Sequence, residues 1–293
     1  MNNSKESFEY YRFLLTPIEE VELPFHGKKD RKEIISEIFS PEKTYKFNSR
    51  GIDYGLRIEL RSENYVYASI GKRVKKNIRT SPEEGFTKKE IEDWPGCDLF
   101  INLSDEHDTG KTKTHGQLIM MQVNNTDMKY RSSLLQKVAS VINKEIQCYG
   151  YFLSINSLPS EKTLFWKVVK ENEGKIKRIT FSYTPPNLLD LKSSLEDDLR
   201  EISSNFNSTK VQISLENSDG NLELSEGNKL LKESAEYVDL GAGSFKLNFK
   251  GNKAISSEDN IKTKTFMDVD ITLRAQHLTI PELNRIMQKL LGD

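Results

Sequence analysis

Residues 176–183, Ile-Lys-Arg-Ile-Thr-Phe-Ser-Tyr, decide the fold class because apolar and polar side chains alternate along them. In an extended chain Ile179, Phe181 and Tyr183 share one face of the strand, and the polar residues between them share the other. A sheet that is buried on both faces gives continuous apolar runs instead. The alternation therefore predicts a sheet with helices on one face and polar side chains on the other. Three later segments alternate in the same way: 211–215, 244–250 and 264–273.

Helical apolar patterns separate and follow these strands. They cover residues 188–206, 225–238 and 279–290. The last helix begins with Thr279 and Glu282 at capping-box spacing, and we expect its apolar stripe to dock on the sheet of its own half. These elements predict an open mixed sheet with helices on one face and ferredoxin-like character.

The first half of the chain mixes strands and helices less regularly. Residues 118–123 are apolar on both faces, which predicts a central strand. Asp30 is placed to cap a short helix that ends before Pro41. The other predicted strands are 8–15, 54–60, 65–70, 99–103 and 151–155, and the other helices are 127–149 and one that begins at 160. The chain is thus predicted to be α+β with two lobes, 1–157 and 158–293.

Composition limits the environment and the partners. The 293 residues have a net charge of −1, so any contact with nucleic acid must come from a local patch. No apolar stretch approaches the ~20 residues of a membrane span, and the first residues lack the apolar core of a secretory signal. Two cysteines are too few for a disulfide framework. We expect a cytoplasmic protein with no membrane contact and no cofactor.

A basic run at 72–79 is the densest charge feature. Cations at this density after a strand can follow a phosphate backbone, and the neighbouring Tyr65 and Tyr67 can stack on bases. The alternative is a solvated rim that is balanced by Glu83 and Glu84. The predicted nucleic-acid-binding residues are Lys72, Arg73, Lys75, Lys76 and Arg79.

Catalytic and metal-binding patterns are weak. The loop that holds His107 and His115 has imidazole and carboxylate groups, but none at the spacing that organises a metal site. No serine nucleophile elbow is present, so catalytic residues stay unassigned and no metal site is predicted. A metal-dependent nuclease remains an alternative, with carboxylates drawn from Asp105, Asp108, Asp268 and Asp270.

The second half contains characteristic strand and turn patterns at 177–181, 185–187, 222–224 and 236–243. Through them the chain resembles an uncharacterised bacterial family over roughly residues 160–275. Members of that family are often found in phage-defence gene neighbourhoods, and the family has no assigned active site. The resemblance implies a role in antiviral defence. Together with the basic run and the absence of a catalytic signature, it leads us to expect a non-enzymatic component of an abortive-infection type defence system that binds nucleic acid or a phage product, with a partner protein or as an oligomer. A regulatory, protein-interaction subunit is the other alternative, acting through the final helix or the polar sheet face.

Overall fold

The fold is α+β, as the sequence predicts. A computed structural model describes residues 5–18, 29–104, 106–108, 113–115, 117–123, 128–185, 193–251, 253–267 and 278–292, without the side chains of 5, 106–108, 113–115, 266 and 267. Within these residues every strand pairing is antiparallel, so the predicted mixed sheet is wrong. No helix in the described ranges is both long and apolar enough to cross a membrane.

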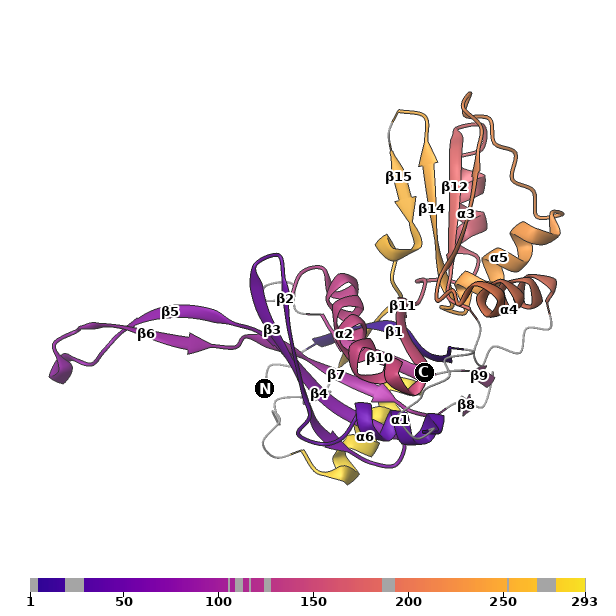
Figure 1. Cartoon of the computed structure of the whole chain (residues 1–293). Helices are drawn as coiled ribbons and strands as arrows, with labels where there is room; N and C mark the ends of the chain where they lie inside the picture. Colours follow the sequence, from indigo (N-terminus) through magenta and orange to yellow (C-terminus); the bar gives the residue numbers. More distant parts are fainter. Residues whose placement is uncertain are drawn as a thin grey trace.

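The larger sheet curls into an antiparallel half-barrel (Figure 1). Its strand order is β11-β1-β10-β7-β4-β3-β2, and β16 pairs with the first part of β1. The predicted central strand is β10, whose residues 117–121 are all buried. The strands are β1 (Lys5–Pro17), β2 (Thr44–Ser49), β3 (Ile52–Arg61), β4 (Tyr65–Lys72), β7 (Gly96–Asn102), β10 (Gln117–Gln122), β11 (Tyr151–Ser157) and β16 (Thr263–Met267).

Two helices fill the concave side of this sheet. Helix α1 (Arg31–Ile38) begins at the predicted cap, where Asp30 and Glu33 form a capping box. Helix α2 (Arg131–Ile146) contacts both β11 and β2, the two edges of the half-barrel. Buried residues of both helices and of the inward strand faces form one core. Helix α2 therefore closes the opening between the sheet edges.

Helix α6 (Ile280–Leu291) packs on the opposite face of the half-barrel. Its stripe forms a core with Phe8, Tyr67 and other residues of this face, and the hydroxyl of Tyr10 donates to the Leu290 carbonyl at 2.9 Å. The expectation that this helix docks on the sheet of its own half is wrong, because an apolar stripe does not specify which sheet covers it. The buried stripe comprises Leu283, Ile286, Met287, Leu290 and Leu291.

The second sheet has four strands in the order β13-β12-β14-β15. Its apolar face shares one core with three helices, and the aromatic residues Phe181, Tyr183, Phe245 and Phe249 are buried there, as predicted. The elements are α3 (Leu164–Glu171), β12 (Ile176–Tyr183), α4 (Ser194–Phe206), β13 (Val211–Glu216), α5 (Lys229–Asp239), β14 (Gly243–Phe249) and β15 (Ala254–Ser256).

The predicted strand 264–273 does not join this sheet where it is described. Residues 263–267 form β16 and pair with β1 of the half-barrel, and 268–273 lie outside the described residues. The fourth strand is instead the short β15. Ferredoxin-like character is not confirmed, and the division at residue 157 stays a prediction, with β16 and α6 both placed on the sheet of the first half.

Two strand pairs stand outside both sheets. Strands β5 (Val74–Arg79) and β6 (Lys88–Asp93) form a two-stranded ribbon that projects from the half-barrel (Figure 1). Strands β8 (Glu106–Asp108) and β9 (Lys113–His115) form a short hairpin. Three short 3-10 helices complete the described elements: η1 (Pro82–Glu84), η2 (Gln147–Tyr149) and η3 (Ser257–Asp259).

Candidate nucleic-acid interface

The projecting ribbon extends from the ends of the neighbouring strands β4 and β7, so that β5 follows β4 and β6 precedes β7. At its root Gly71 pairs with Gly96, and a Cβ at Gly96 would lie 2.0 Å from the Ile70 carbonyl oxygen. The backbones approach this closely because neither residue has a side chain. The ring of Trp94 packs where a Gly55 side chain would stand, 3.5 Å from its Cβ position. Glycines and one indole thus set the direction in which the ribbon leaves the sheet.

The far end of the ribbon is a compact turn. Thr80 N–H donates to the Thr87 carbonyl at 3.0 Å, and the two threonine hydroxyls lie 3.0 Å apart. The 3-10 turn η1 ends at Gly85, whose φ of 72° favours glycine. Every residue from 81 to 90 is exposed, including Phe86 at 59%. The ribbon is therefore accessible to a partner along both strands and at the tip.

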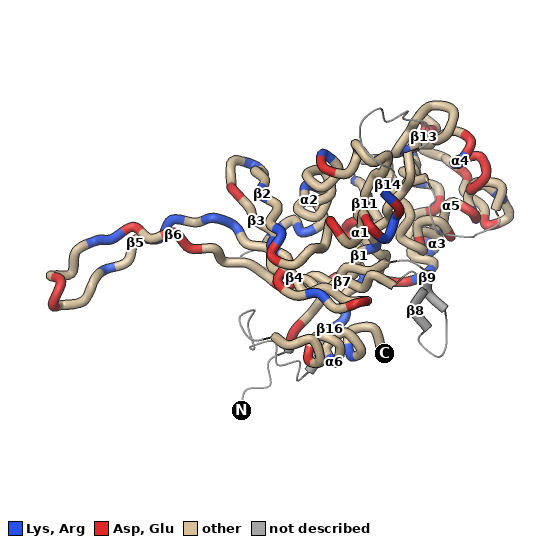
Figure 2. The backbone as a smooth tube through the Cα atoms, turned by 60° about the horizontal axis from the view of Figure 1, so that its bottom comes forward, with Lys and Arg blue, Asp and Glu red and all other residues tan. Residues whose placement is uncertain are grey.

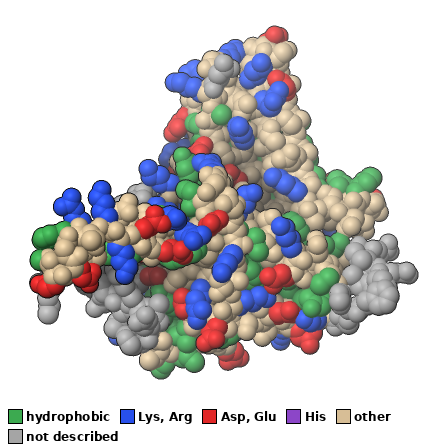
Figure 3. Space-filling view, turned by 60° about the vertical axis from the view of Figure 1, so that its left-hand side comes forward, with side chains coloured by type: hydrophobic (Ala, Val, Ile, Leu, Met, Phe, Trp, Pro, Cys, Tyr) green, Lys and Arg blue, Asp and Glu red, His purple; other side chains and the backbone are tan. Residues whose placement is uncertain are grey.

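The two faces of the ribbon differ in chemistry. Residues directly opposite in an antiparallel pair share a face, so Val74, Ile78 and Ile91 lie together with Lys76 and Lys89 between them. The other face carries only polar and charged residues along the strands: Lys75, Asn77, Arg79, Lys88, Glu90 and Glu92. Figure 3 shows basic and apolar side chains close together on the projecting ribbon.

Near the root, three of the predicted cations are already paired with carboxylates of β6. Arg73 lies 2.7 Å from Glu92, and Lys75 lies 2.7 Å from Glu90. Lys76 pairs with Asp93. Hydrogen bonds from Arg73 and Lys76 hold the pKa values of Glu92 and Asp93 below their usual range. Exposed pairs of this kind stabilise a fold little, but they lower the local positive charge.

At the end of the strands nearest the tip, cations lie opposite each other rather than opposite carboxylates. Arg79 lies directly opposite Lys88, and Lys89, the next residue along β6, lies on the other face of the ribbon. Like charges that face each other across a strand pair are destabilising. No ion pair is recorded for these three cations within the described part of the chain. Figure 2 shows basic stretches on both strands of the ribbon, with an acidic patch at its tip.

The structure therefore divides the five predicted binding residues. Lys72, Arg73, Lys75 and Lys76 lie at or near the root, and Arg79 lies near the tip. The sequence interpretation missed Lys88 and Lys89, which the turn at 81–86 brings beside Arg79. The carboxylates that pair directly with Arg73, Lys75 and Lys76 are ones that it did not name. Glu83 is hydrogen-bonded to Ser81, which lowers its pKa, and the ion pairs are made by Glu90, Glu92 and Asp93.

The residues of the nuclease alternative fall largely outside the described structure. Asp105, Asp268 and Asp270 are not described, and Asp108 is described without its side chain, as are His107 and His115 of the same loop. Among the described side chains, no group of three or more His, Cys, Asp or Glu residues is placed to hold a metal ion. Cys97 is buried in the half-barrel core, and the thiol of Cys148 donates to the Glu145 carbonyl at 3.1 Å.

Comparison with known proteins gives no relative: no family model, no curated protein and no solved structure matches the chain.

Proposed function

We propose that this protein binds double-stranded DNA through the β5–β6 ribbon, with Arg79, Lys88 and Lys89 as the principal phosphate contacts. The observation that carries the proposal is the direct opposition of Arg79 and Lys88 on one face, with Lys89 next to them on the other face, on a ribbon that no third strand among the described residues covers. The arrangement costs stability in the isolated protein. Phosphate between the strands would remove that cost.

The shape of the ribbon supports a duplex with B-form geometry. The major groove of B-DNA is about 12 Å wide and admits a two-stranded β-ribbon. Six residues in each strand give a ribbon of roughly 20 Å, which is long enough to enter the groove. The major groove of A-form RNA is too narrow for such an element. Duplex DNA is therefore the ligand that this geometry favours over duplex RNA.

The ion pairs at the root of the ribbon limit where DNA is bound in this proposal. Because Glu92, Glu90 and Asp93 pair with Arg73, Lys75 and Lys76, these cations contribute little to non-specific attraction. The carboxylates restrict phosphate contact to the outer half of the ribbon. Removing them should extend the contact toward the half-barrel.

The test compares DNA affinity and its salt dependence in matched charge variants. We expect the triple variant Arg79→Glu, Lys88→Glu, Lys89→Glu to lose measurable binding in fluorescence anisotropy with a labelled duplex. Single Ala variants at these positions should each lower the slope of log affinity against log salt by about 0.9. The double variant Glu90→Gln, Glu92→Gln should bind more tightly than the wild type, because Lys75 and Arg73 are released.

The control is a triple variant with the same change in net charge at exposed lysines elsewhere: Lys170→Glu, Lys232→Glu and Lys253→Glu. It should keep most of the wild-type affinity. Equal losses in both triple variants would show a general charge effect and refute a ribbon site. Salt-insensitive binding, or no binding by the wild type at low salt, would refute the proposal altogether.

The defence role is proposed on the family resemblance alone. If the protein belongs to such a system, DNA binding by the ribbon is the step through which it would detect an invading genome. The alternative role of the final helix as a partner handle has little support, since the apolar stripe of α6 lies buried against the half-barrel.

A further inference from the structure

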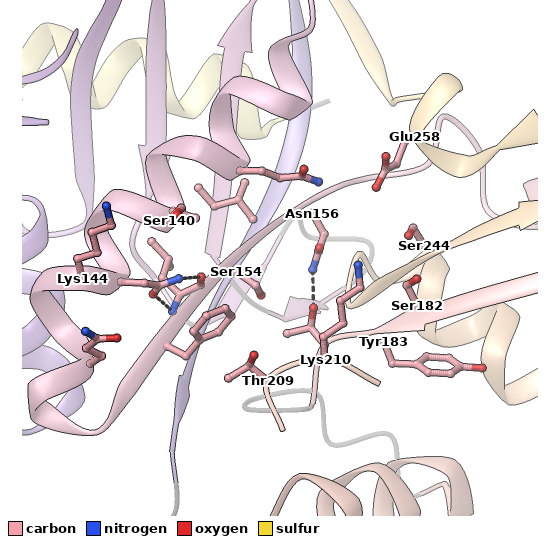
Figure 4. Close-up of a pocket in the computed structure, with 18 residues that line it drawn as sticks. Ser140, Lys144, Ser154, Asn156, Ser182, Tyr183, Thr209, Lys210, Ser244 and Glu258 are labelled. Atoms are coloured by element: carbon pink, nitrogen blue, oxygen red, sulfur yellow. Dashed lines mark hydrogen bonds between the residues drawn. The ribbon is translucent and has the colours of Figure 1, made fainter. Parts of the chain in front are cut away.

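A cavity of about 490 Å³ lies at the free edge of the half-barrel, away from the ribbon. Helix α2 and strand β11 form one wall, and residues of β12, β14 and the segment before β13 form the other. Figure 4 shows Lys144 and Ser140 at one end and Ser244 and Glu258 at the other. Ser154 lies in the middle, and Asn156 and Lys210 lie between it and the Glu258 end. The volume falls within the range of roughly 300–1,000 Å³ that is common for small-molecule sites.

The charged groups of this cavity are not paired with each other. Lys144, Lys210 and Glu258 all line it, and within the described residues no ion pair is recorded for any of them. Elsewhere on the surface, lysines such as Lys43, Lys75 and Lys167 are paired. Two ammonium groups and one carboxylate around a single hollow favour a ligand with an anionic end.

Strand β11 supplies polar groups to the middle of the cavity. The Ser154 Oγ atom is buried and has no hydrogen-bond partner among the residues that the structure describes. The backbone N–H and C=O of Leu153 bind the side-chain amide of Asn143, at 2.6 and 2.8 Å. The next outward-facing backbone groups on this edge, two residues along, are those of Ile155, which lines the cavity. A buried hydroxyl and backbone groups that face away from the neighbouring strand β1 are groups that a hydroxyl-bearing ligand would satisfy.

The far end of the cavity combines a donor and acceptors. Lys210 can only donate and Glu258 can only accept when ionised. Asn156 uses its amide nitrogen to donate to the Thr184 hydroxyl at 3.2 Å, which leaves its carbonyl oxygen as an acceptor. A second anion at this end would be repelled by Glu258. A neutral group with both donors and acceptors on its edge matches these partners.

We propose that this cavity binds a small organic anion of nucleotide size, with its anionic group at Lys144, its hydroxyls at Ser154 and Ile155, and a neutral hydrogen-bonding ring between Lys210 and Glu258. A nucleoside 5′-monophosphate has all three parts. The site is independent of the DNA-binding ribbon, since the two share no residue.

The test is isothermal titration calorimetry of the full chain with the four ribonucleoside 5′-monophosphates, with ribose 5-phosphate and with the free nucleosides. At least one monophosphate should bind, and its nucleoside and ribose 5-phosphate should each bind about tenfold or more weakly. Lys144→Ala should weaken the monophosphate about tenfold and leave the nucleoside unchanged. Glu258→Gln should weaken the monophosphate and the nucleoside but leave ribose 5-phosphate unchanged.

Lys170→Ala is the matched control and should change none of these affinities, because this exposed lysine lies on α3 outside the cavity. Absence of binding by all four monophosphates at millimolar concentration overturns the proposal. Binding that Lys144→Ala and Glu258→Gln leave unchanged overturns it as well. The ribbon triple variant should retain monophosphate binding, so failure of one site is distinguishable from failure of the other.

Discussion

Removing Arg131 should destabilise the half-barrel more than removing any exposed arginine. Arg131 opens helix α2, and its guanidinium binds both carboxylate oxygens of Glu9 on β1, with 2.8 Å from Nε to Oε2. The Tyr11 hydroxyl donates to the same carboxylate at 2.5 Å. Both side chains of the pair retain 12% exposure. The Arg131→Met variant would leave a carboxylate mostly buried without its cation.

The expected cost follows from this burial. Breaking a buried ion pair by removing one partner costs about 3–5 kcal/mol, and the residual exposure places this pair at the lower end, near 3 kcal/mol. At a urea m-value of about 3 kcal/mol/M, the unfolding midpoint falls by about 1 M. Urea unfolding followed by circular dichroism measures this shift. Part of the loss should return when Glu9→Gln is added, because the unpaired charge is removed.

The loss should also depend on pH. Burial raises the pKa of Glu9, but hydrogen bonds from Arg131 and Tyr11 outweigh it and the pKa lies below its ordinary value. The stability from this pair is therefore present above the unfolded-state pKa and is lost as pH falls through the lowered folded value. In Arg131→Met burial dominates and raises the pKa of Glu9. The difference between wild type and variant should then shrink from pH 7 toward pH 4.

An exposed pair provides the control. Arg178 and Glu216 lie on the second sheet with side-chain exposures of 45% and 39%, so Arg178→Met should cost no more than about 1 kcal/mol. A cost for Arg131→Met as small as that of the control, or one that does not change between pH 7 and 4, would refute the argument.

Three further substitutions test other parts of the fold. Gly96→Ala should destabilise the chain by about 1–3 kcal/mol in thermal or urea unfolding, because its Cβ would meet the Ile70 carbonyl oxygen at 2.0 Å. Leu290→Ala should cost about 2–5 kcal/mol without changing the mass in solution, since this side chain is buried within the molecule; a shift to a smaller oligomer would contradict it. Arg12→Met should be neutral or stabilising by about 1 kcal/mol. Two nitrogens of this buried guanidinium lack partners among the described residues, and burial lowers its pKa to about 10. A loss above 1 kcal/mol would instead show an unrecognised ion pair.

Local features of this fold are visible in the sequence because they depend on neighbouring residues. The helix cap at Asp30 depends only on Glu33, three residues later. In the structure the two residues form the two hydrogen bonds of a capping box. The alternation in 176–183 predicts the bounds of β12 and the burial of its aromatic face. Two-sided burial of β10 follows from its continuous apolar run.

Partner choice between distant segments was not predictable, since it depends on shape and not on pattern. Alternation in 263–267 is compatible with either sheet, and pairing with β1 is decided by the rest of the half-barrel. Likewise, the stripe of α6 fits any apolar surface of its width. The strand order therefore emerges only from the complete chain.

The β5–β6 ribbon could not be predicted from the sequence for a different reason. Lysine and glutamate are uncommon in strands, so 74–79 and 88–93 give no strand signal, although the basic residues themselves are conspicuous. Their ion-pair partners lie 15 to 19 residues away across the turn. The sequence thus identifies a cationic segment, and only the structure shows which cations are neutralised.

The pairing of β16 with β1 has a consequence for how the chain folds during synthesis. Ser7 and Thr265, which share a hydrogen bond between these strands, are 258 residues apart. Strand β1 is synthesised well before β16, so one stretch of it lacks its partner until the 258 residues from Ser7 to Thr265 have been added. Contacts of such long sequence separation slow folding. We expect a nascent chain that ends before residue 263 to expose an incomplete strand edge on β1, and the synthesis of β16 to cover it.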